Sequence, residues 1–315
     1  MPSPPVKLHQ LLLSWQLGDP LAALAFALQV LAVLWYGGAV LRLRRRGVRW
    51  SPARSTSFVA GVVVLCVAVV SGVASYDDRV FVVHIFQHLL LMMVAPPLLA
   101  LGAPVTLAIQ AARRPLQGRI VRLLHRRVVR FLATPLFSGL LYYASMYAIL
   151  LTPYYRYSLQ HELVHDASHV VMLLIGCLFW WPMIGIDPLP NRPTLAMRLI
   201  WIFAGMPFEV FLGVAIMNFS RPIAPEHTVA DTHAGGAVFW VASMLVTLAA
   251  AVVILAQWMP QEERETLRQA RAGSREGTAA ARPARQRDFW AAAWSAKAGS
   301  PPVTATGAAA RDPDP

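Results

Sequence analysis

The sequence predicts an all-α integral membrane protein with seven transmembrane helices, and its composition, its long apolar runs and its arginine placement all point that way. The chain of 315 residues is 57% hydrophobic and only 14% charged, whereas about a quarter of the residues of a soluble domain are charged. A helix needs about 20 apolar residues to cross a bilayer. The runs are continuous, which does not fit the alternating strands of a membrane β-barrel.

The apolar runs give the order of the spans. We expect them at residues 21–41, 58–74, 84–110, 132–151, 165–186, 198–219 and 235–259, the second being the shortest. They form a transmembrane domain over residues 19–259, after an outer leader at residues 1–18. Residues 260–315 have few large apolar side chains, so we expect a disordered basic cytoplasmic tail. Because proline lacks an amide hydrogen, Pro96 and Pro97 should kink the third helix.

Arginine is concentrated in alternate connecting segments. Six arginines fall within residues 42–54, seven within 113–130 and eight after Met259, and two more flank the fifth loop. The opposite segments have one basic residue each: Lys7, Arg79, Arg156 and Arg221. By the positive-inside rule, the N-terminus is outside and the C-terminus is cytoplasmic. Arginines beside apolar spans contact the anionic headgroups of the lipid bilayer, so the basic charge does not require a nucleic-acid partner.

One of these basic segments has a helical pattern of its own. Residues 116–131 alternate arginine with leucine, isoleucine and valine at helical spacing. Such a segment is typical of an amphipathic helix lying in the membrane interface. We expect one helix there, on the inner surface.

Most of the histidines fall on one side of the membrane in this topology. Seven of the nine lie at the outer side: His84, His88, His161, His165, His169, His227 and His233. Two groups recur at steps of four residues, which return to nearly the same helix face. Imidazole is the commonest protein metal ligand, and ionisable groups within a membrane are costly and usually functional. The pattern indicates a metal or proton site at the outer ends of spans three and five.

Other residues extend this candidate site. Met92 continues the stripe of His84 and His88, and nitrogen ligands above a thioether suit copper, with core packing as the alternative. Asp231 is either a ligand or a helix N-cap. Glu209 lies inside span six, so we expect it to be protonated or hydrogen-bonded to a tyrosine or histidine. Asp166 directly follows His165, and such a carboxylate can orient a ligating imidazole.

Four segments carry a family resemblance: HIFQHLLLMMVAPPLLALGAPV (84–105), HELVHDASHVVMLLIGCLFWWPMIGIDPLP (161–190), MPFEVFLGVAIMN (206–218) and DTHAGGAVFW (231–240). Together they resemble the polytopic CtaG family of cytochrome c oxidase assembly factors. The resemblance implies a bacterial plasma-membrane protein needed to assemble the copper-containing core of a haem–copper terminal oxidase. It also implies functional roles for His84, His88, His165, His169 and Asp231. The family tends to have glutamine where this chain has His233, which either adds a ligand or belongs to a cap and turn.

We therefore expect an assembly factor, not an enzyme, that binds copper as Cu(I). The expected metal ligands are His84, His88, His165, His169, His233, Asp231 and Met92. Glu209 would supply charge balance or proton exchange, since ligands lose protons when they bind metal. The partners would be cytochrome c oxidase subunits or a periplasmic copper donor. The alternatives are a haem protein with two axial histidines, a metal transporter or channel, and a scaffold whose histidines only stabilise helix packing.

Overall fold

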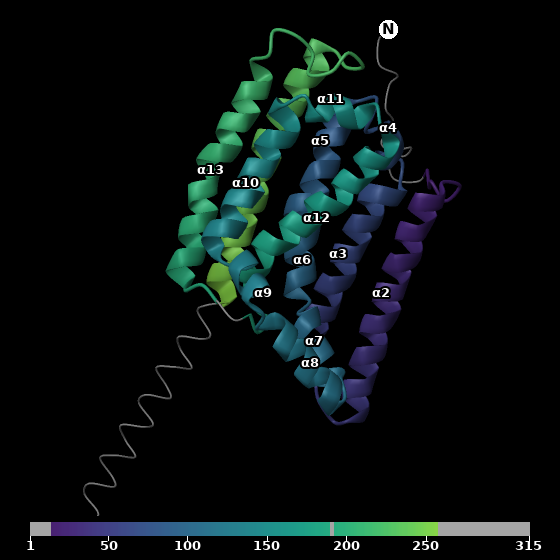
Figure 1. Ribbon diagram of the computed structural model, residues 1–315, viewed down its shortest axis with the longest axis vertical. Coiled ribbons are helices and arrows are strands. Elements are labelled where there is room, and N and C mark those ends of the chain that lie inside the picture. Colours follow the sequence, from purple (N-terminus) through teal and green to yellow (C-terminus); the bar gives the residue numbers. More distant parts are fainter. Residues whose placement is uncertain (1–13, 190–191, 258–315) are drawn as a thin grey trace, which may run out of the picture. The chain divides into compact units, whose positions relative to one another are not determined.

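The fold is taken from a computed structural model of the chain, which describes residues 14–189 and 192–257 (Figure 1). These residues form helices and no strand, so the all-α prediction is confirmed. By its contacts the chain separates into Met1–Leu255 and Ala256–Pro315, and the features below belong to the first unit. The predicted tail at residues 260–315, and most of the predicted leader, lie outside the described residues.

Each predicted span coincides with an apolar helix. Within the described residues, six helices are long and apolar enough to cross a membrane: Pro20–Arg45 (α2), Pro52–Tyr76 (α3 and α4), Phe81–Ala111, Glu162–Ile184 (α12), Leu195–Met217 (α13) and Val229–Gln257. A further apolar helix, Pro135–Leu151 (α10), has only 17 residues. These helices have the length and composition of a multi-pass membrane protein. Seven crossings and the sides of the two termini stay predictions.

Cap residues and prolines set where the helices begin. The Asp19 carboxylate accepts the amides of Leu21 and Ala22, and Pro20 occupies the first position of α2. Thr194 caps α13 by accepting the amide of Met197. A capping oxygen satisfies amides that have no partner within the helix, and proline has no amide to satisfy. The sequence itself therefore specifies these boundaries.

The second long helix consists of two pieces, α3 (Pro52–Val70) and the short α4 (Val73–Tyr76). It starts earlier than the predicted span at residues 58–74, since Pro52 follows the N-cap residue Ser51. The α4 segment brings the chain to Asp77 at the end of the bundle where α5 begins (Figure 1). This position is the basis of the site described below.

The third span is divided by its prolines. It consists of α5 (Phe81–Leu89), the π-helical turn η1 (Leu90–Val94), α6 (Ala95–Leu101) and α7 (Pro104–Ala111). Pro96 and Pro97 cannot donate to carbonyls one turn earlier, which releases the Met92 carbonyl. The Trp180 indole N–H donates to this carbonyl at 3.0 Å. The predicted disruption therefore takes the form of a π turn held by a side chain of α12.

Close packing holds α12 against this turn. A Cβ atom on Gly176 would lie 2.8 Å from the Met92 carbonyl oxygen and 2.8 Å from Cγ of Pro96. Only glycine allows the two backbones to approach this closely. In Figure 1, α12 runs obliquely across the third span between α5 and α6, starting at the end of the bundle where α11 (Tyr154–Leu159) lies.

The segment predicted to form one amphipathic helix has a different structure. Instead of one helix over residues 116–131, the structure has α8 (Arg114–Leu124) and α9 (Arg127–Leu132). The break falls at His125, whose backbone N–H donates to the Val121 carbonyl at 3.1 Å and whose Nδ1 lies 2.9 Å from the same oxygen. Arg126 is then extended and begins the second helix. The helix end is a local side-chain effect that periodicity does not reveal.

Candidate metal centre

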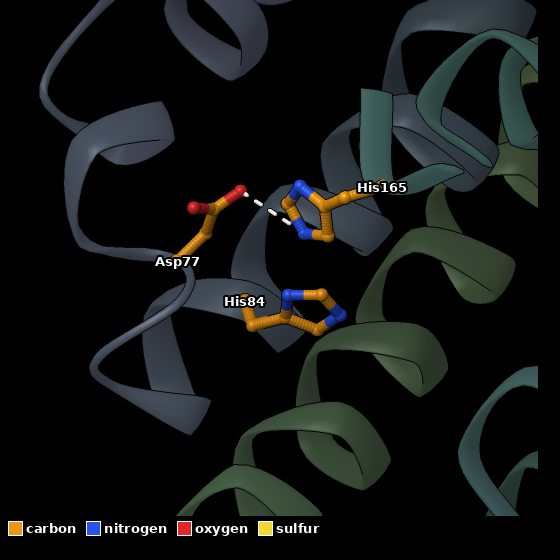
Figure 2. A group of neighbouring side chains, drawn as sticks. All are labelled: Asp77, His84 and His165. Carbon is orange, nitrogen blue, oxygen red and sulfur yellow. Dashed lines mark ion pairs between the residues drawn. The ribbon is translucent and has the colours of Figure 1, made fainter. Parts of the chain in front are cut away.

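A buried carboxylate absent from the predicted ligand set lies at the centre of the site. Asp77 directly follows α4 and is only 3% exposed. Its Oδ2 atom lies 3.7 Å from Nε2 of His165 and 3.7 Å from Nε2 of His169. Figure 2 shows the Asp77 carboxylate pointing toward the His165 ring, with the His84 ring beside both. The end of the second long helix therefore faces the first turns of α12.

The histidines of α5 and α12 come together as their spacing predicts. The ring centroids of His84 and His88 are 4.1 Å apart, and those of His165 and His169 are 4.5 Å apart. His84 bridges the two helices, with its centroid 5.6 Å from that of His165. We call Asp77, His84, His165 and His169 the outer cluster.

The outer cluster, together with the neighbouring Asp166, offers two compact sets of metal-ligating atoms. Those of Asp77, His84 and His165 all lie within 4.8 Å of one another, as do those of His165, Asp166 and His169. Ligands about 2.0–2.1 Å from a tetrahedral metal are roughly 3.4 Å apart. The side chains would therefore move inward by about 1 Å or more to bind an ion, a distance within the reach of side-chain rotations.

Several buried polar atoms of the outer cluster have no hydrogen-bond partner. Both ring nitrogens of His84 are buried and unpartnered, as are Nε2 of His165, Nε2 of His169 and Oδ2 of Asp77. A buried unsatisfied polar group costs about 1–3 kcal/mol, and a bound ion or ordered water is a usual explanation. A bound cation would satisfy several of these atoms at once. Imidazole and carboxylate donors suit divalent transition metals, and copper binds such sets most tightly.

Burial controls the charge of Asp77. Loss of solvent raises the pKa of this carboxyl to about 8, and repulsion from neighbouring Asp78 adds to the effect. The raised pKa favours the protonated carboxyl at neutral pH in the free protein, and its 3.7 Å contacts with His165 and His169 are charged pairs only when the imidazole is protonated. A metal ion that binds here displaces this proton.

Asp231 caps a helix other than its own. Its carboxylate accepts the amide of Phe81 at 2.7 Å and that of Val82 at 3.2 Å. These are the first residues of α5, the helix that carries His84. Asp231 itself lies inside the helix Val229–Gln257, so the interpretation that it is the N-cap of its own helix is wrong. It also belongs to neither compact set of ligating atoms.

A hydrogen-bonded tyrosine and histidine lie against the outer cluster. The Tyr155 hydroxyl is 2.7 Å from Nε2 of His227, and Nδ1 of His227 is 3.7 Å from Oδ2 of Asp231. The Tyr155 ring packs edge-on against His84, with centroids 4.8 Å apart. Burial raises the pKa of Tyr155 and lowers the pKa of His227. Tyr155 and His227 therefore form an uncharged, hydrogen-bonded pair, and Tyr155 packs against the His84 ring and holds it in place.

The remaining predicted residues occupy other surroundings. Nε2 of His233 lies 2.9 Å from the Phe219 carbonyl oxygen. Glu209 is 2% exposed and accepts a hydrogen bond from the Thr247 hydroxyl at 3.2 Å, so its partner is neither the tyrosine nor the histidine expected. His88 and Met92 line a small pocket beside the cluster.

Asp77 carries a weak signal in the sequence. It stands in the Asp77-Asp78 pair between the second and third apolar runs, seven residues before His84. An acidic residue so close to a His-x-x-x-His pair is a ligand candidate, but its burial depends on how α4 meets α12. Sequence spacing does not encode that contact.

Comparison with known proteins gives one family. A family model described as cytochrome c oxidase caa3 assembly factor (Caa3_CtaG) matches residues 34–261. Uncharacterized proteins of Mycobacterium leprae, Mycobacterium bovis and Mycobacterium tuberculosis are each 32% identical over 289 residues. Each match covers 86% of this chain and 43% of the relative, so the chain spans less than half the length of these relatives. No solved structure matches the chain significantly.

Proposed function

Because this chain belongs to the cytochrome c oxidase caa3 assembly factor family, we propose that it binds copper at the outer cluster for the maturation of a haem–copper terminal oxidase. It acts as an assembly factor and not as an enzyme. The observation that carries the copper proposal is the convergence of unpartnered, buried nitrogen and oxygen atoms from three separate segments. Copper is favoured because imidazole nitrogen is a ligand that suits it, and the ion is proposed to be held as Cu(I).

The proposed topology gives the outer cluster its compartment. Seven crossings, including α10, with the arginine-rich segments in the cytoplasm, place Asp77 and the four clustered histidines of α5 and α12 on the outer side of the bacterial plasma membrane. That side is accessible to a periplasmic copper donor and to oxidase subunits in the same bilayer. These are the proposed partners.

The residues of the site take distinct roles in this proposal. His84 and His165 bind the ion together with Asp77, whose negative charge offsets the charge of the metal once its proton leaves. His169 is a further ligand that shares the Asp77 carboxylate. Asp231 positions His84 by capping α5, and Glu209 supplies charge balance deeper in the bundle.

The test is oxidase maturation in a host strain that lacks this chain. The strain receives the wild type, His84→Ala, or His161→Ala as a matched control, because His161 is an exposed histidine whose Nδ1 contacts the Tyr157 carbonyl. We expect His84→Ala to lower the copper content and activity of the mature oxidase while the chain itself stays at its normal level in membranes. His161→Ala should behave as wild type.

Two outcomes would contradict the proposal. Oxidase with its normal copper content in the His84→Ala strain would show that the outer cluster is not needed for maturation. A Soret band in the visible spectrum of the purified wild-type chain would instead favour the haem alternative. The metal content of the same purified sample distinguishes a copper-binding or haem-binding protein from a scaffold, which would bind neither copper nor haem.

A further inference from the structure

A small, mostly apolar pocket with three methionines in its lining lies next to the outer cluster. Its lining includes His88, Met92, Met93, Met146 and Phe239. His88 links this pocket to the outer cluster, since its ring is in contact with that of His84 at a centroid distance of 4.1 Å. The pocket therefore continues inward from the proposed copper site.

The π turn explains how two consecutive methionines reach one pocket. In an α-helix only Met92, four residues after His88, would share its face, and Met93 would point aside. In a π turn the hydrogen bonds run from residue i to i+5, so the residue at i+5 also lies near residue i. The η1 turn (Leu90–Val94) contains both methionines and brings them to the same pocket. Such turns occur frequently at functional sites.

The lining is buried and carries no carboxylate. Met92 is 2% exposed, Met93 is 0% and Met146, from α10, is 5%, while His88 is 7% exposed. Thioethers and one neutral imidazole are soft ligands that suit a cuprous ion. Because the pocket has no anionic ligand, a divalent ion would bring twice as much uncompensated charge into this low-dielectric region as a monovalent ion would. The pocket is therefore suited to a monovalent soft cation, in contrast to the outer cluster with Asp77.

We propose that His88, Met92, Met93 and Met146 form a second metal site that receives Cu(I) from the outer cluster. This inference rests on the proposed function, which supplies the ion. The transfer is a ligand exchange from His84 to the adjacent His88, in which copper stays Cu(I) and no electron moves. The paired sites would select the oxidation state, because only the monovalent ion is accepted by the inner lining.

The experiment measures Cu(I) bound by the detergent-purified chain against a competing Cu(I) chelator, with X-ray absorption on the loaded protein. The inner site is removed by Met92→Leu/Met93→Leu/Met146→Leu, because leucine conserves volume. Met172→Leu is the matched control, since Met172 is equally buried and outside the pocket lining. The single variant Met146→Leu changes only α10 and leaves the π turn intact.

We expect the wild type to bind two Cu(I) per chain and to show sulfur neighbours in the absorption spectrum. The triple variant should bind one ion with nitrogen and oxygen neighbours only. The Met146→Leu variant should bind the second ion at least about tenfold more weakly than the wild type does. The Met172→Leu control should bind copper as the wild type does. Wild-type copper with only nitrogen and oxygen neighbours, unchanged in the triple variant, would overturn this inference and leave the proposed function standing. Failure of the wild type to bind copper at all would overturn both.

Discussion

The Oδ2 atom of Asp77 lies 3.7 Å from Nε2 of His165, and both atoms are buried without a hydrogen-bond partner. Two unsatisfied polar atoms at this distance are suited to share a cation between them, because each would gain a ligand bond in place of a missing hydrogen bond. The contact joins the end of α4 to the start of α12, so it also sets how these helices meet. Asp77 is therefore the first residue to test.

Replacing Asp77 with asparagine should weaken copper binding by at least about tenfold. The amide keeps the shape of the side chain but cannot supply the negative charge, and loss of a metal ligand or its partner costs about 10–100-fold in affinity. Titration of the purified chain with copper in the presence of a competing chelator gives the affinity. His161→Ala is the control, because His161 is exposed and lies outside the outer cluster. Equal affinities in Asp77→Asn and wild type would remove Asp77 from the ligand set.

Copper affinity should rise with pH up to about 8 and then level off. The pKa of Asp77 is raised to about 8 by burial, so below that pH a proton must leave before the carboxylate binds the metal. One displaced proton gives a slope of about one log unit of affinity per pH unit. The difference in slope between wild type and Asp77→Asn isolates this residue from the histidines. Identical slopes in the two proteins would show that Asp77 releases no proton on binding.

Asp231→Ala should destabilise the chain and also weaken copper binding, although Asp231 is not a proposed ligand in the structure. The variant leaves the amides of Phe81 and Val82 without their acceptor, and loss of a cap costs about 0.5–2 kcal/mol. The start of α5 would then fray and His84 would lose its fixed position. Thermal unfolding in detergent and copper titration measure the two effects. Asp231→Asn, which keeps an accepting oxygen, should recover most of the stability.

Gly176→Ala should lower stability by about 1–3 kcal/mol, the usual cost of overpacking a core. The new methyl group would meet the Met92 carbonyl oxygen at 2.8 Å and push α12 away from η1. Gly118→Ala is the control, since a Cβ atom there has nothing within 4 Å. Thermal unfolding in the same detergent gives the stabilities of Gly176→Ala, Gly118→Ala and the wild type for comparison. A Gly176→Ala protein as stable as wild type would mean that the contact between α12 and η1 is loose.

The sequence predicts much of the fold and the histidine pairs, because both depend on local periodicity. Spacing alone places His84 beside His88 and His165 beside His169, as the ring distances confirm. The burial of Asp77 depends instead on tertiary contact between α4 and α12. The proline pair predicts a disturbance in the third span, but its form as a π turn also depends on Trp180 reaching the Met92 carbonyl. Residues far apart in the sequence determine these two features.

The short helix α10 should cross the membrane, with α8 on the cytoplasmic side and α11 outside. At 1.5 Å per residue its 17 residues span about 26 Å, slightly less than the roughly 30 Å of a bilayer core. In a background without Cys66 and Cys177, Tyr157→Cys should react with a membrane-impermeant maleimide in intact cells, whereas Arg119→Cys should react only after permeabilisation. Tyr157 and Arg119 lie in exposed positions of α11 and α8. Labelling of both cysteines in intact cells, or of neither, would place α8 and α11 on the same side and reduce the crossings to six.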